Sequence, residues 1–388
     1  MKSYDYLIVG GGMAAAAAIK GIRELDRDGS IGVLGAEPDP PYDRPPLSKG
    51  LWRGKPIEAI WMDAADADLR LGRFVKELQS SKHAVVCEDG ELFEYGRLLI
   101  ATGGRPRRLS PIDDSAVYLR DLRDYRDLRA RCEGAQRFLV VGGGLIASEI
   151  AAALAMTGKR VALAFPEEGI AARLLPRDIS RWLNEFYRGK GVEVFPGESV
   201  GSLETQGSLK IARTLSGKAI DAEVVVAGLG ILPNADFAAQ AGLLVEDGIS
   251  VGPELRSSDP DVFAAGDVAS FYCGALGRRI RPEHEDNALA MGLAAGRNMA
   301  GADEPYDRIP YFYSDLFDLG YEAVGELDPS RETFIDWKSR NESAVVYYLD
   351  GGRLRGVLLW NVRKRSEAAR ALIAETGPFR PEELVGRL

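Results

Sequence analysis

One glycine-containing stretch near the start of the chain constrains the fold more than any other part of the sequence. An apolar run leads into Gly10 and Gly12 and then into an alanine-rich segment, which is the order strand, turn and helix of a dinucleotide-binding unit. Gly10 allows the tight turn, Gly12 lets the backbone approach a pyrophosphate, and Ala15 lets the helix pack closely on the strand. Glu37 follows a second apolar run, where a carboxylate accepts hydrogen bonds from ribose hydroxyls. Glycines that merely ended a buried strand would explain neither the helix nor Glu37.

The same pattern returns in the middle of the chain. An apolar strand runs into Gly142 and Gly144, a second helix begins at Leu145 and Ile146, and Glu167 follows the next apolar strand. Two such units predict two bound dinucleotides. A chain that holds a flavin dinucleotide on one unit and a nicotinamide dinucleotide on the other can move a hydride between them.

Length and charge limit the classes of protein to consider. A chain of 388 residues is long enough for two or three domains. Its 49 Lys and Arg against 58 Asp and Glu give a formal net charge of -9, which argues against nucleic acid or an anionic membrane as a partner. Asp5 interrupts the apolar run that follows Lys2, and no stretch of about twenty apolar residues occurs. We therefore expect no transmembrane helix and a cytoplasmic protein.

The cysteines and histidines are few and scattered. Cys87, Cys132 and Cys273 lie far apart and form no CxxC pair, and the chain has only two histidines, His83 and His284. A redox-active dithiol and a metal site are therefore not expected.

Three further buried strands end in residues that suit a ligand crevice, because ligands of parallel sheets bind at the carboxyl ends of the strands. The residues that follow these strands are Ala101, Thr102 and Gly103 after 98–100, Gly230 after 224–227, and Asp267 after the strand that begins near 261.

The remaining pattern alternates strands and helices until the last eighty residues. We predict a hairpin at Asp89-Gly90 and an antiparallel hairpin or meander over 199–220. The predicted helices cover 121–131, 145–157, 179–188, 285–299 and 366–375, and successive C-terminal strands cover 321–324, 332–337, 344–349 and 354–360. The pattern predicts an α/β protein with two Rossmann-like nucleotide-binding domains and a C-terminal α+β domain.

Several ordered motifs resemble one flavoprotein family along nearly the whole chain. The motifs are Pro41-Tyr42-Asp43-Arg44-Pro45-Pro46-Leu47-Ser48-Lys49, Ala101-Thr102-Gly103-Gly104, Gly228-Leu229-Gly230-Ile231-Leu232-Pro233-Asn234, Phe263-Ala264-Ala265-Gly266-Asp267 and Glu283-His284. They are similar to apoptosis-inducing factor and the oxygenase-coupled ferredoxin reductases, a glutathione-reductase-type fold without the redox disulfide. The resemblance implies an FAD domain over 1–116 and 240–308, an NAD(H) domain over 117–239 and a C-terminal domain over 309–388.

The resemblance also implies a set of cofactor-binding residues. Arg44 and Arg120 would neutralise phosphate charge, Val75 would contact adenine through its backbone, and Asp267 would bind the ribityl chain. The full FAD set is Gly10, Gly12, Ala15, Glu37, Arg44, Lys49, Val75, Ala101, Thr102, Gly103, Arg120, Asp267, Glu283, His284 and Tyr313, and the NAD set is Gly142, Gly144, Leu145, Ile146, Glu149, Glu167 and Gly230. For Arg120, the alternative is one solvated charge on a polar helix.

Lys49 and Glu149 are the catalytic residues that the resemblance implies. The family places this lysine against the flavin N5 atom and pairs it with the glutamate. A buried lysine needs a carboxylate, and an ammonium at that place attracts the incoming hydride equivalent. The alternative is an ordinary surface lysine.

Two features of the sequence bear on specificity. Tyr313 stands where the family usually has a tryptophan, so the stacking there differs. Glu167 favours NADH because a carboxylate binds the 2′-hydroxyl and repels a 2′-phosphate, whereas Arg173 a few residues later keeps NADPH open.

The leading functional hypothesis is an FAD enzyme that takes hydride from NADH and passes electrons to a ferredoxin- or rubredoxin-type protein, as a monomer or homodimer. Arg278-Arg279 with Arg281, and Arg363-Lys364-Arg365, are candidate basic landing sites for an acidic acceptor, although scattered solvated charge explains them equally well. The alternatives are a slow redox sensor like apoptosis-inducing factor, whose assembly changes on reduction, and a reductase of monodehydroascorbate, a quinone or oxygen.

Overall fold

The computed structural model describes residues 2–110 and 115–388. The chain forms two compact units, each assembled from three segments. The first unit contains residues 1–44, 56–105 and 232–310, and the second contains residues 45–55, 106–231 and 311–388. The boundaries of the three predicted domains differ from those of these two units. The division into three domains stays a prediction. The predicted segment 1–116 also includes residues 1 and 111–114, which lie outside the described residues.

The first unit is built on a mostly parallel sheet with the strand order β3-β2-β1-β6-β5-β4, and β19 pairs with β6. These strands are β1 (Lys2–Val9), β2 (Ile31–Gly35), β3 (Asp68–Leu71), β4 (Val75–Gln79), β5 (Ala84–Cys87), β6 (Leu92–Ile100) and β19 (Val262–Ala264). β1 runs parallel to β2 and β6, whereas β5 pairs antiparallel with both β4 and β6. The predicted hairpin at Asp89-Gly90 is therefore present, and its second strand continues without a break into the buried segment 98–100.

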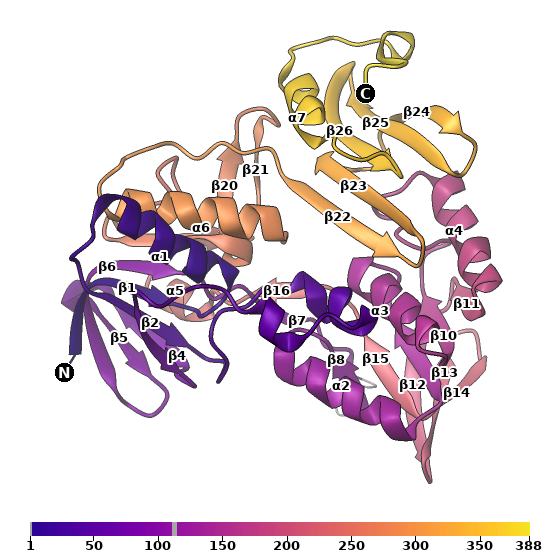
Figure 1. The fold of residues 1–388 in the computed structure, drawn as a ribbon, viewed down its shortest axis with the longest axis horizontal. Helices are drawn as coiled ribbons and strands as arrows, with labels where there is room; N and C mark the ends of the chain where they lie inside the picture. Colours follow the sequence, from indigo (N-terminus) through magenta and orange to yellow (C-terminus); the bar gives the residue numbers. More distant parts are fainter. Residues whose placement is uncertain (1, 111–114) are drawn as a thin grey trace. The chain divides into compact units, whose positions relative to one another are not determined.

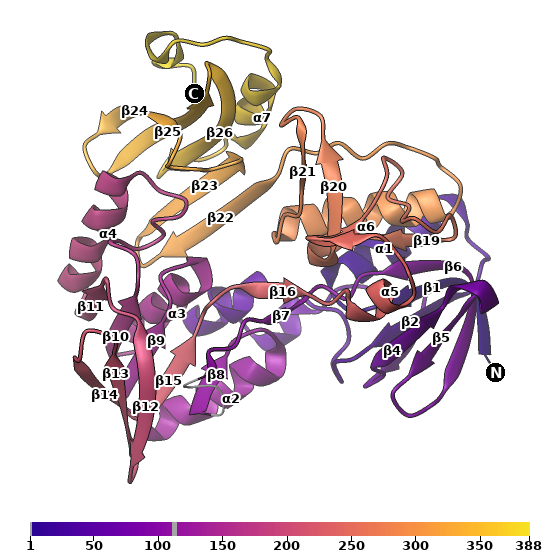
Figure 2. The same ribbon diagram turned by 180° about the vertical axis from the view of Figure 1, so that it is seen from behind.

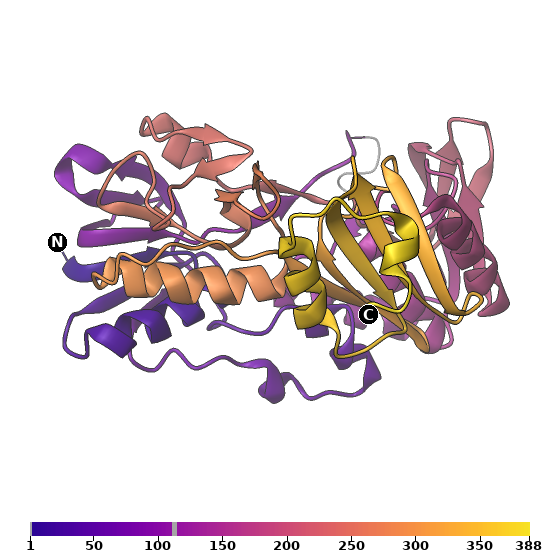
Figure 3. The ribbon, with the colours of Figure 1, turned by 90° about the horizontal axis from the view of Figure 1, so that it is seen from above.

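Two helices of the first unit, α1 (Met13–Leu25) and α6 (Glu285–Met299), lie side by side (Figures 1 and 3). Their contact depends on small residues. A Cβ atom added at Gly296 would lie 2.1 Å from the Ala18 carbonyl oxygen, and one at Gly292 would lie 2.3 Å from that of Ala14. The backbones of the two helices therefore approach more closely than any side chain at these positions would allow.

The first unit also contains elements that the sequence pattern did not predict. A four-stranded sheet has the order β17-β18-β20-β21. Its strands are short: β17 (Val245–Glu246), β18 (Gly248–Ser250), β20 (Ala269–Cys273) and β21 (Arg278–Ile280), and the short helix α5 (Asp236–Gln240) precedes them. Periodicity is a weak signal in strands of two to five residues, which explains why they were missed.

The second unit contains a five-stranded parallel sheet with the order β11-β10-β9-β15-β8. Its strands are β8 (Ala116–Tyr118), β9 (Arg137–Val141), β10 (Arg160–Phe165), β11 (Val192–Pro196) and β15 (Val224–Ala227), and its helices are α2 (Leu122–Gly134), α3 (Leu145–Met156) and α4 (Arg177–Gly189). Asp121 caps α2 by accepting a hydrogen bond from the backbone N–H of Asp124. The second predicted nucleotide-binding unit therefore has the expected strand, helix and strand.

An antiparallel sheet of β12 (Val200–Gln206), β13 (Leu209–Thr214) and β14 (Ala219–Ala222) belongs to the same unit (Figure 2). Its inward side chains Val200, Ala212 and Ile220 share one hydrophobic core with Leu139 and Val225 of the parallel sheet. The meander predicted over 199–220 is confirmed, and burial of one apolar face against the parallel sheet stabilises it.

The C-terminal part of the second unit is an antiparallel sheet with the order β22-β23-β26-β25-β24, against which α7 (Ser366–Ala374) packs. The strands are β22 (Tyr311–Leu316), β23 (Leu319–Gly325), β24 (Glu332–Ser339), β25 (Ser343–Asp350) and β26 (Arg353–Trp360). The four predicted strands are present, whereas β22 was not predicted.

A separate two-stranded sheet is formed by β7 (Gly104–Pro106) and β16 (Ile231–Pro233). Within residues 2–110 and 115–388, no helix is both long and apolar enough to cross a membrane.

The contact between α1 and α6 generates a test of the fold. We expect Gly296→Ala to lower the free energy of unfolding by about 1–3 kcal/mol, because the added methyl group meets a backbone carbonyl that cannot turn away. The loss should appear as a lower urea midpoint followed by circular dichroism. Gly134→Ala in α2 is the matched control, since its added Cβ has no atom within 4 Å apart from its chain neighbours and the backbone of its own helix. Equal midpoints for the two variants would contradict this packing argument.

Candidate functional site

The first glycine turn lies between β1 and α1 and is fixed by backbone contacts. Gly10 has a φ of +113°, and a Cβ atom there would lie 2.2 Å from the carbonyl oxygen of Ala101. The Gly10 N–H donates to the Leu34 carbonyl at 2.9 Å. Only glycine fits this turn, which brings the start of α1 to the carboxyl ends of β1, β2 and β6.

The start of α1 has the properties of a phosphate site. Gly12 is the N-cap residue of α1, and no side chain caps the helix. The first N–H groups of α1 can therefore donate to a bound anion. A Cβ atom at Gly12 would come no closer than 3.7 Å to protein, to Nη2 of Arg44. The protein therefore leaves room over Gly12 and places a guanidinium beside it, while Ala15 is fully buried beneath the turn. An anionic pyrophosphate fits this arrangement.

Glu37 follows β2 as predicted and has protein partners of its own. Arg44 forms an ion pair with Glu37, and the Tyr42 hydroxyl donates to Glu37 Oε2 at 2.6 Å. The Arg44 guanidinium also lies over the Tyr42 ring, 5.0 Å from its centroid. These contacts fix the positions of Glu37 and Arg44, both predicted to bind the cofactor, relative to each other.

The residues that follow β6 are tied to a segment far away in sequence. Thr102 Oγ1 donates to the Asn234 carbonyl at 2.8 Å, and Asn234 Nδ2 donates back to the Thr102 carbonyl at 3.0 Å. The Asn234 N–H also donates to the Gly103 carbonyl. Asn234 belongs to a quoted motif but was not among the predicted site residues, although it fixes this crevice. Val75 is buried at the first position of β4.

Arg281 organises the predicted residues around the start of α6. It donates to the Asp267 carbonyl at 2.9 Å and forms ion pairs with Glu283 at 2.7 Å and Asp247 at 2.8 Å. Its side chain is only 7% exposed. Arg281 was one candidate for a basic landing site or, alternatively, a solvated charge; neither interpretation fits, because its guanidinium is buried and paired with Asp247 and Glu283 within the first unit. The local sequence 278–281 could not predict the ion pair of Arg281 with Asp247, which lies 34 residues earlier.

His284 is the N-cap residue of α6, as its predicted position before a helix required. Burial lowers the pKa of His284 to about 4. The imidazole is therefore neutral at neutral pH, and it adds no positive charge to that of the helix N-terminus.

The second glycine turn repeats the first one in the second unit. Gly142 has a φ of +121°, and its added Cβ would lie 2.3 Å from the Gly228 carbonyl oxygen. Gly144 is the N-cap residue of α3, no side chain caps the helix, and an added Cβ would have no atom within 4 Å apart from its chain neighbours. In the first turn of α3, Leu145 is half-buried and Ile146 is exposed. This second cradle also fits a pyrophosphate.

Glu167 lies just beyond β10, as predicted, and its side chain is 24% exposed. It accepts a hydrogen bond from Arg173 Nε at 2.9 Å. Gly230 follows β15 in a left-handed conformation with a φ of +84°. The second unit therefore brings together the predicted glycine turn and Gly230 at the carboxyl ends of adjacent parallel strands.

A buried ionic cluster in the second unit contains the two predicted catalytic residues. Lys49 Nζ lies 2.8 Å from Glu149 Oε2, and the Glu149 side chain is only 2% exposed. Ser48 donates to Glu149 Oε2 and Ser314 donates to Oε1, both at 2.6 Å. Glu149 is therefore a buried carboxylate with three donors, which offset the cost of removing its charge from water. Ser48 and Ser314 were not predicted as site residues.

Tyr313 and Arg120 also belong to the second unit. Tyr313 lies on β22, and Lys49 Nζ is 5.2 Å from its ring centroid, a distance at which an ammonium and an aromatic ring attract each other. The backbone N–H of Arg120 donates to Asp124 Oδ2 at the start of α2. The phosphate contact predicted for Arg120 stays a prediction.

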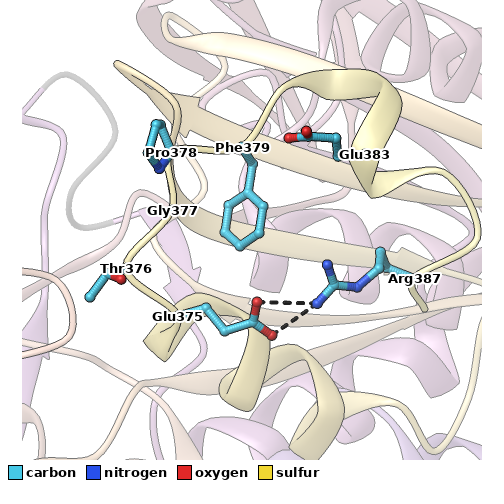
Figure 4. Close-up of a pocket in the computed structure, with 7 residues that line it drawn as sticks. All are labelled: Glu375, Thr376, Gly377, Pro378, Phe379, Glu383 and Arg387. Carbon is cyan, nitrogen blue, oxygen red and sulfur yellow. Dashed lines mark hydrogen bonds and ion pairs between the residues drawn. The ribbon is translucent and has the colours of Figure 1, made fainter.

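Two further observations concern sites of other kinds. Among the described residues, no group of three or more His, Cys, Asp and Glu side chains is arranged to hold a metal ion. A pocket of about 490 Å³ lies in the C-terminal segment and is lined by Phe379 and by the Glu375–Arg387 ion pair (Figure 4). None of the predicted site residues lines this pocket.

Comparisons with known proteins relate the chain to one family and to solved structures. The model of a family described as pyridine nucleotide-disulphide oxidoreductase matches residues 4–292. The chain is 34% identical to the anthranilate 1,2-dioxygenase system ferredoxin–NAD(+) reductase component of Burkholderia cepacia, covering 99% of this chain and 97% of that one. It is 32% identical to mitochondrial apoptosis-inducing factor 1 of Dictyostelium discoideum, covering 96% and 79%. It is similar to the structure of the covalent putidaredoxin reductase–putidaredoxin complex, with a TM-score of 0.92, 27% identity and coverage of 99% and 96%.

The two cradles can be tested separately by substitution of their N-cap glycines. We expect Gly12→Ala to weaken FAD retention and Gly144→Ala to weaken NADH binding, each by at least about tenfold, because the methyl group occupies the space over the helix N–H donors. FAD retention is measured from the visible absorbance after gel filtration, and NADH affinity by fluorescence titration. Each variant is the control for the other, and a loss of both ligands in either one would indicate misfolding instead.

Proposed function

The chain belongs to the pyridine nucleotide-disulphide oxidoreductase family, and we propose that it takes hydride from NADH and delivers electrons to a small ferredoxin- or rubredoxin-type protein. Family membership confirms the predicted oxidoreductase class, the Rossmann-type fold and the use of FAD and NAD(H). Bound FAD supplies the chemistry that this reaction needs, since it accepts two electrons together and releases them singly. The relatives that reduce ferredoxins support the choice of acceptor.

The main support for this proposal is that the three cysteines form no redox-active dithiol. Cys87, Cys132 and Cys273 are all free and buried, and burial raises the pKa of each thiol, that of Cys273 to about 11. Ser48 and Lys49 lie in the segment where disulphide reductases of this type carry their cysteines, and both donate to Glu149. With no thiolate to carry electrons onward, a one-electron protein acceptor fits this chain better than a disulphide substrate.

The residues of each unit have distinct roles in the proposal. In the first unit, the N-terminus of α1 and Arg44 bind the FAD pyrophosphate, Glu37 binds the adenosine ribose, and Asp267 binds the ribityl chain. Val75, Ala101–Gly103, Glu283 and His284 complete the contacts of the first unit. In the second unit, the N-terminus of α3 binds the NADH pyrophosphate and Glu167 its ribose. A cytoplasmic location and a monomeric or homodimeric state stay predictions.

Lys49 is proposed to act on the flavin, as the resemblance implies. Glu149 holds the lysine in one orientation, while Ser48 and Ser314 fix the carboxylate. The side chain of Lys49 is 13% exposed, so its ammonium is largely shielded from water. A fixed charge of this kind stabilises developing negative charge more effectively than a solvated one does.

Reduction and reoxidation of the purified FAD-loaded protein test the function. We expect anaerobic NADH to bleach the flavin quickly and an added [2Fe–2S] ferredoxin to restore its colour much faster than air does, because the flavin can pass single electrons directly to an iron–sulfur centre. Stopped-flow absorbance measures both steps. Slow bleaching to a long-lived charge-transfer complex, with altered sedimentation, would contradict the proposal and support a redox sensor.

The role of Lys49 predicts a specific kinetic defect. We expect Lys49→Met to slow flavin reduction by NADH by about 10²-fold, because the charge that stabilises the transferring hydride is lost. FAD content and the Kd for NADH should change little. Lys190→Met, which removes an exposed lysine paired with Asp318 in the same unit, is the control and should keep the original rate. An unchanged rate in Lys49→Met would remove Lys49 from the catalytic residues.

A further inference from the structure

Glu167, the residue predicted to bind the NADH ribose, and the next residue, Glu168, form ion pairs with three arginines in the second unit. Glu167 pairs with Arg173 at 2.8 Å. Glu168, the next residue, accepts a hydrogen bond from Arg177 Nε at 2.8 Å and pairs with Arg181 Nη2 at 2.6 Å. Two carboxylates therefore pair with three guanidinium groups, which leaves a net charge of +1, and Glu168 pairs with two of the three.

The loop that carries these charges is fixed to the nucleotide cradle. The Ala171 N–H donates to the Gly143 carbonyl at 2.7 Å, which ties the loop to the second glycine turn. Asn184 of α4 donates to the Glu168 carbonyl at 2.9 Å and accepts from the Ile170 N–H at 3.1 Å. Because Arg177 and Arg181 lie on the same helix as Asn184, their position relative to Glu168 follows from the fold and not from chance contact.

The chemistry of these groups matches a phosphate better than a hydroxyl. Guanidinium groups bind phosphate oxygens in bidentate fashion, and the 2′-phosphate is what distinguishes NADPH from NADH. The Arg177 and Arg181 side chains are 66% and 52% exposed, so ion pairs of this kind contribute little to stability and exchange readily. Both arginines also lower the pKa of Glu168, which keeps it ionised as their competitor for phosphate.

We propose that Glu168 is a second specificity determinant of the nicotinamide site, distinct from Glu167. By holding Arg177 and Arg181 in ion pairs, Glu168 prevents them from binding a 2′-phosphate and so keeps the protein selective for NADH. Removal of its charge exposes a site for the 2′-phosphate of NADPH. This inference rests on the proposed use of NADH at the second cradle.

The test compares the binding of NAD⁺ and NADP⁺ to the FAD-loaded protein by isothermal titration calorimetry. In E168Q, the Kd for NADP⁺ is expected to fall about tenfold, while the Kd for NAD⁺ stays within about twofold. E167Q is expected to weaken NAD⁺ instead, because Glu167 binds the ribose itself. E185Q is the matched control, since Glu185 is an exposed carboxylate of the same helix paired with Arg188, and it should change neither Kd.

A triple variant identifies the groups that bind the phosphate. E168Q/R177A/R181A is expected to lose the gain in NADP⁺ affinity and return to the affinity of the unsubstituted protein. The gain in E168Q should also shrink at high salt, because exposed charges are screened.

Three outcomes would overturn the inference. These are an equal gain in E168Q and E185Q, no gain in E168Q while the unsubstituted protein binds NAD⁺ normally, and a gain that survives in the triple variant. If the unsubstituted protein binds neither nucleotide, the proposed use of NADH is wrong and the inference falls with it.

Discussion

The close backbone contact at two glycine turns is the constraint from which both nucleotide sites follow. Gly10 lies against the Ala101 carbonyl and Gly142 against the Gly228 carbonyl, at distances that exclude a Cβ atom. In each unit this contact seats the start of a helix at the carboxyl edge of a parallel sheet and leaves its first N–H groups uncapped. A capping side chain at Gly12 or Gly144 would satisfy those donors and remove the anion site. The N-terminal N–H groups of both helices are thus left to donate to an anionic ligand.

The buried carboxylate of Glu149 imposes a second constraint, on the second unit alone. A charge that is 2% exposed requires donors, and α3 by itself supplies none. The donors come from Ser48 and Lys49 before η2 (Gly50–Arg53) and from Ser314 on β22. One charged residue therefore links three segments that are distant in sequence. Loss of its charge partner would leave an uncompensated carboxylate, which gives a structural reason for the presence of Lys49 besides its proposed chemistry.

Local and non-local features of the site differ in how far the sequence could predict them. The turns at Gly10 and Gly142, the places of Glu37 and Glu167 just after a strand, and the start of α6 at Glu285 depend on short-range spacing, and the sequence predicts these positions correctly. The partners of Glu149 lie 100 or more residues away, so only a family resemblance suggested Lys49 and nothing suggested Ser314. The role of Arg281 was mispredicted for the same reason, because its partner Asp247 lies in the turn between β17 and β18, far from Arg281 in sequence. Chain topology, not composition, decides these pairings.

The two carboxylates that are proposed to bind ribose, Glu37 and Glu167, differ in how firmly their arginine partners are held. Glu37 is paired with Arg44, whose side chain is 23% exposed and also contacts the Tyr42 ring. Glu167 is paired with Arg173, whose side chain is 84% exposed. An exposed arginine leaves its partner at little cost, whereas a half-buried one in a fixed frame stays in place and is preorganised for a phosphate. This asymmetry suits a resident dinucleotide in the first unit and an exchanging one in the second, as a reaction that consumes NADH and retains FAD requires.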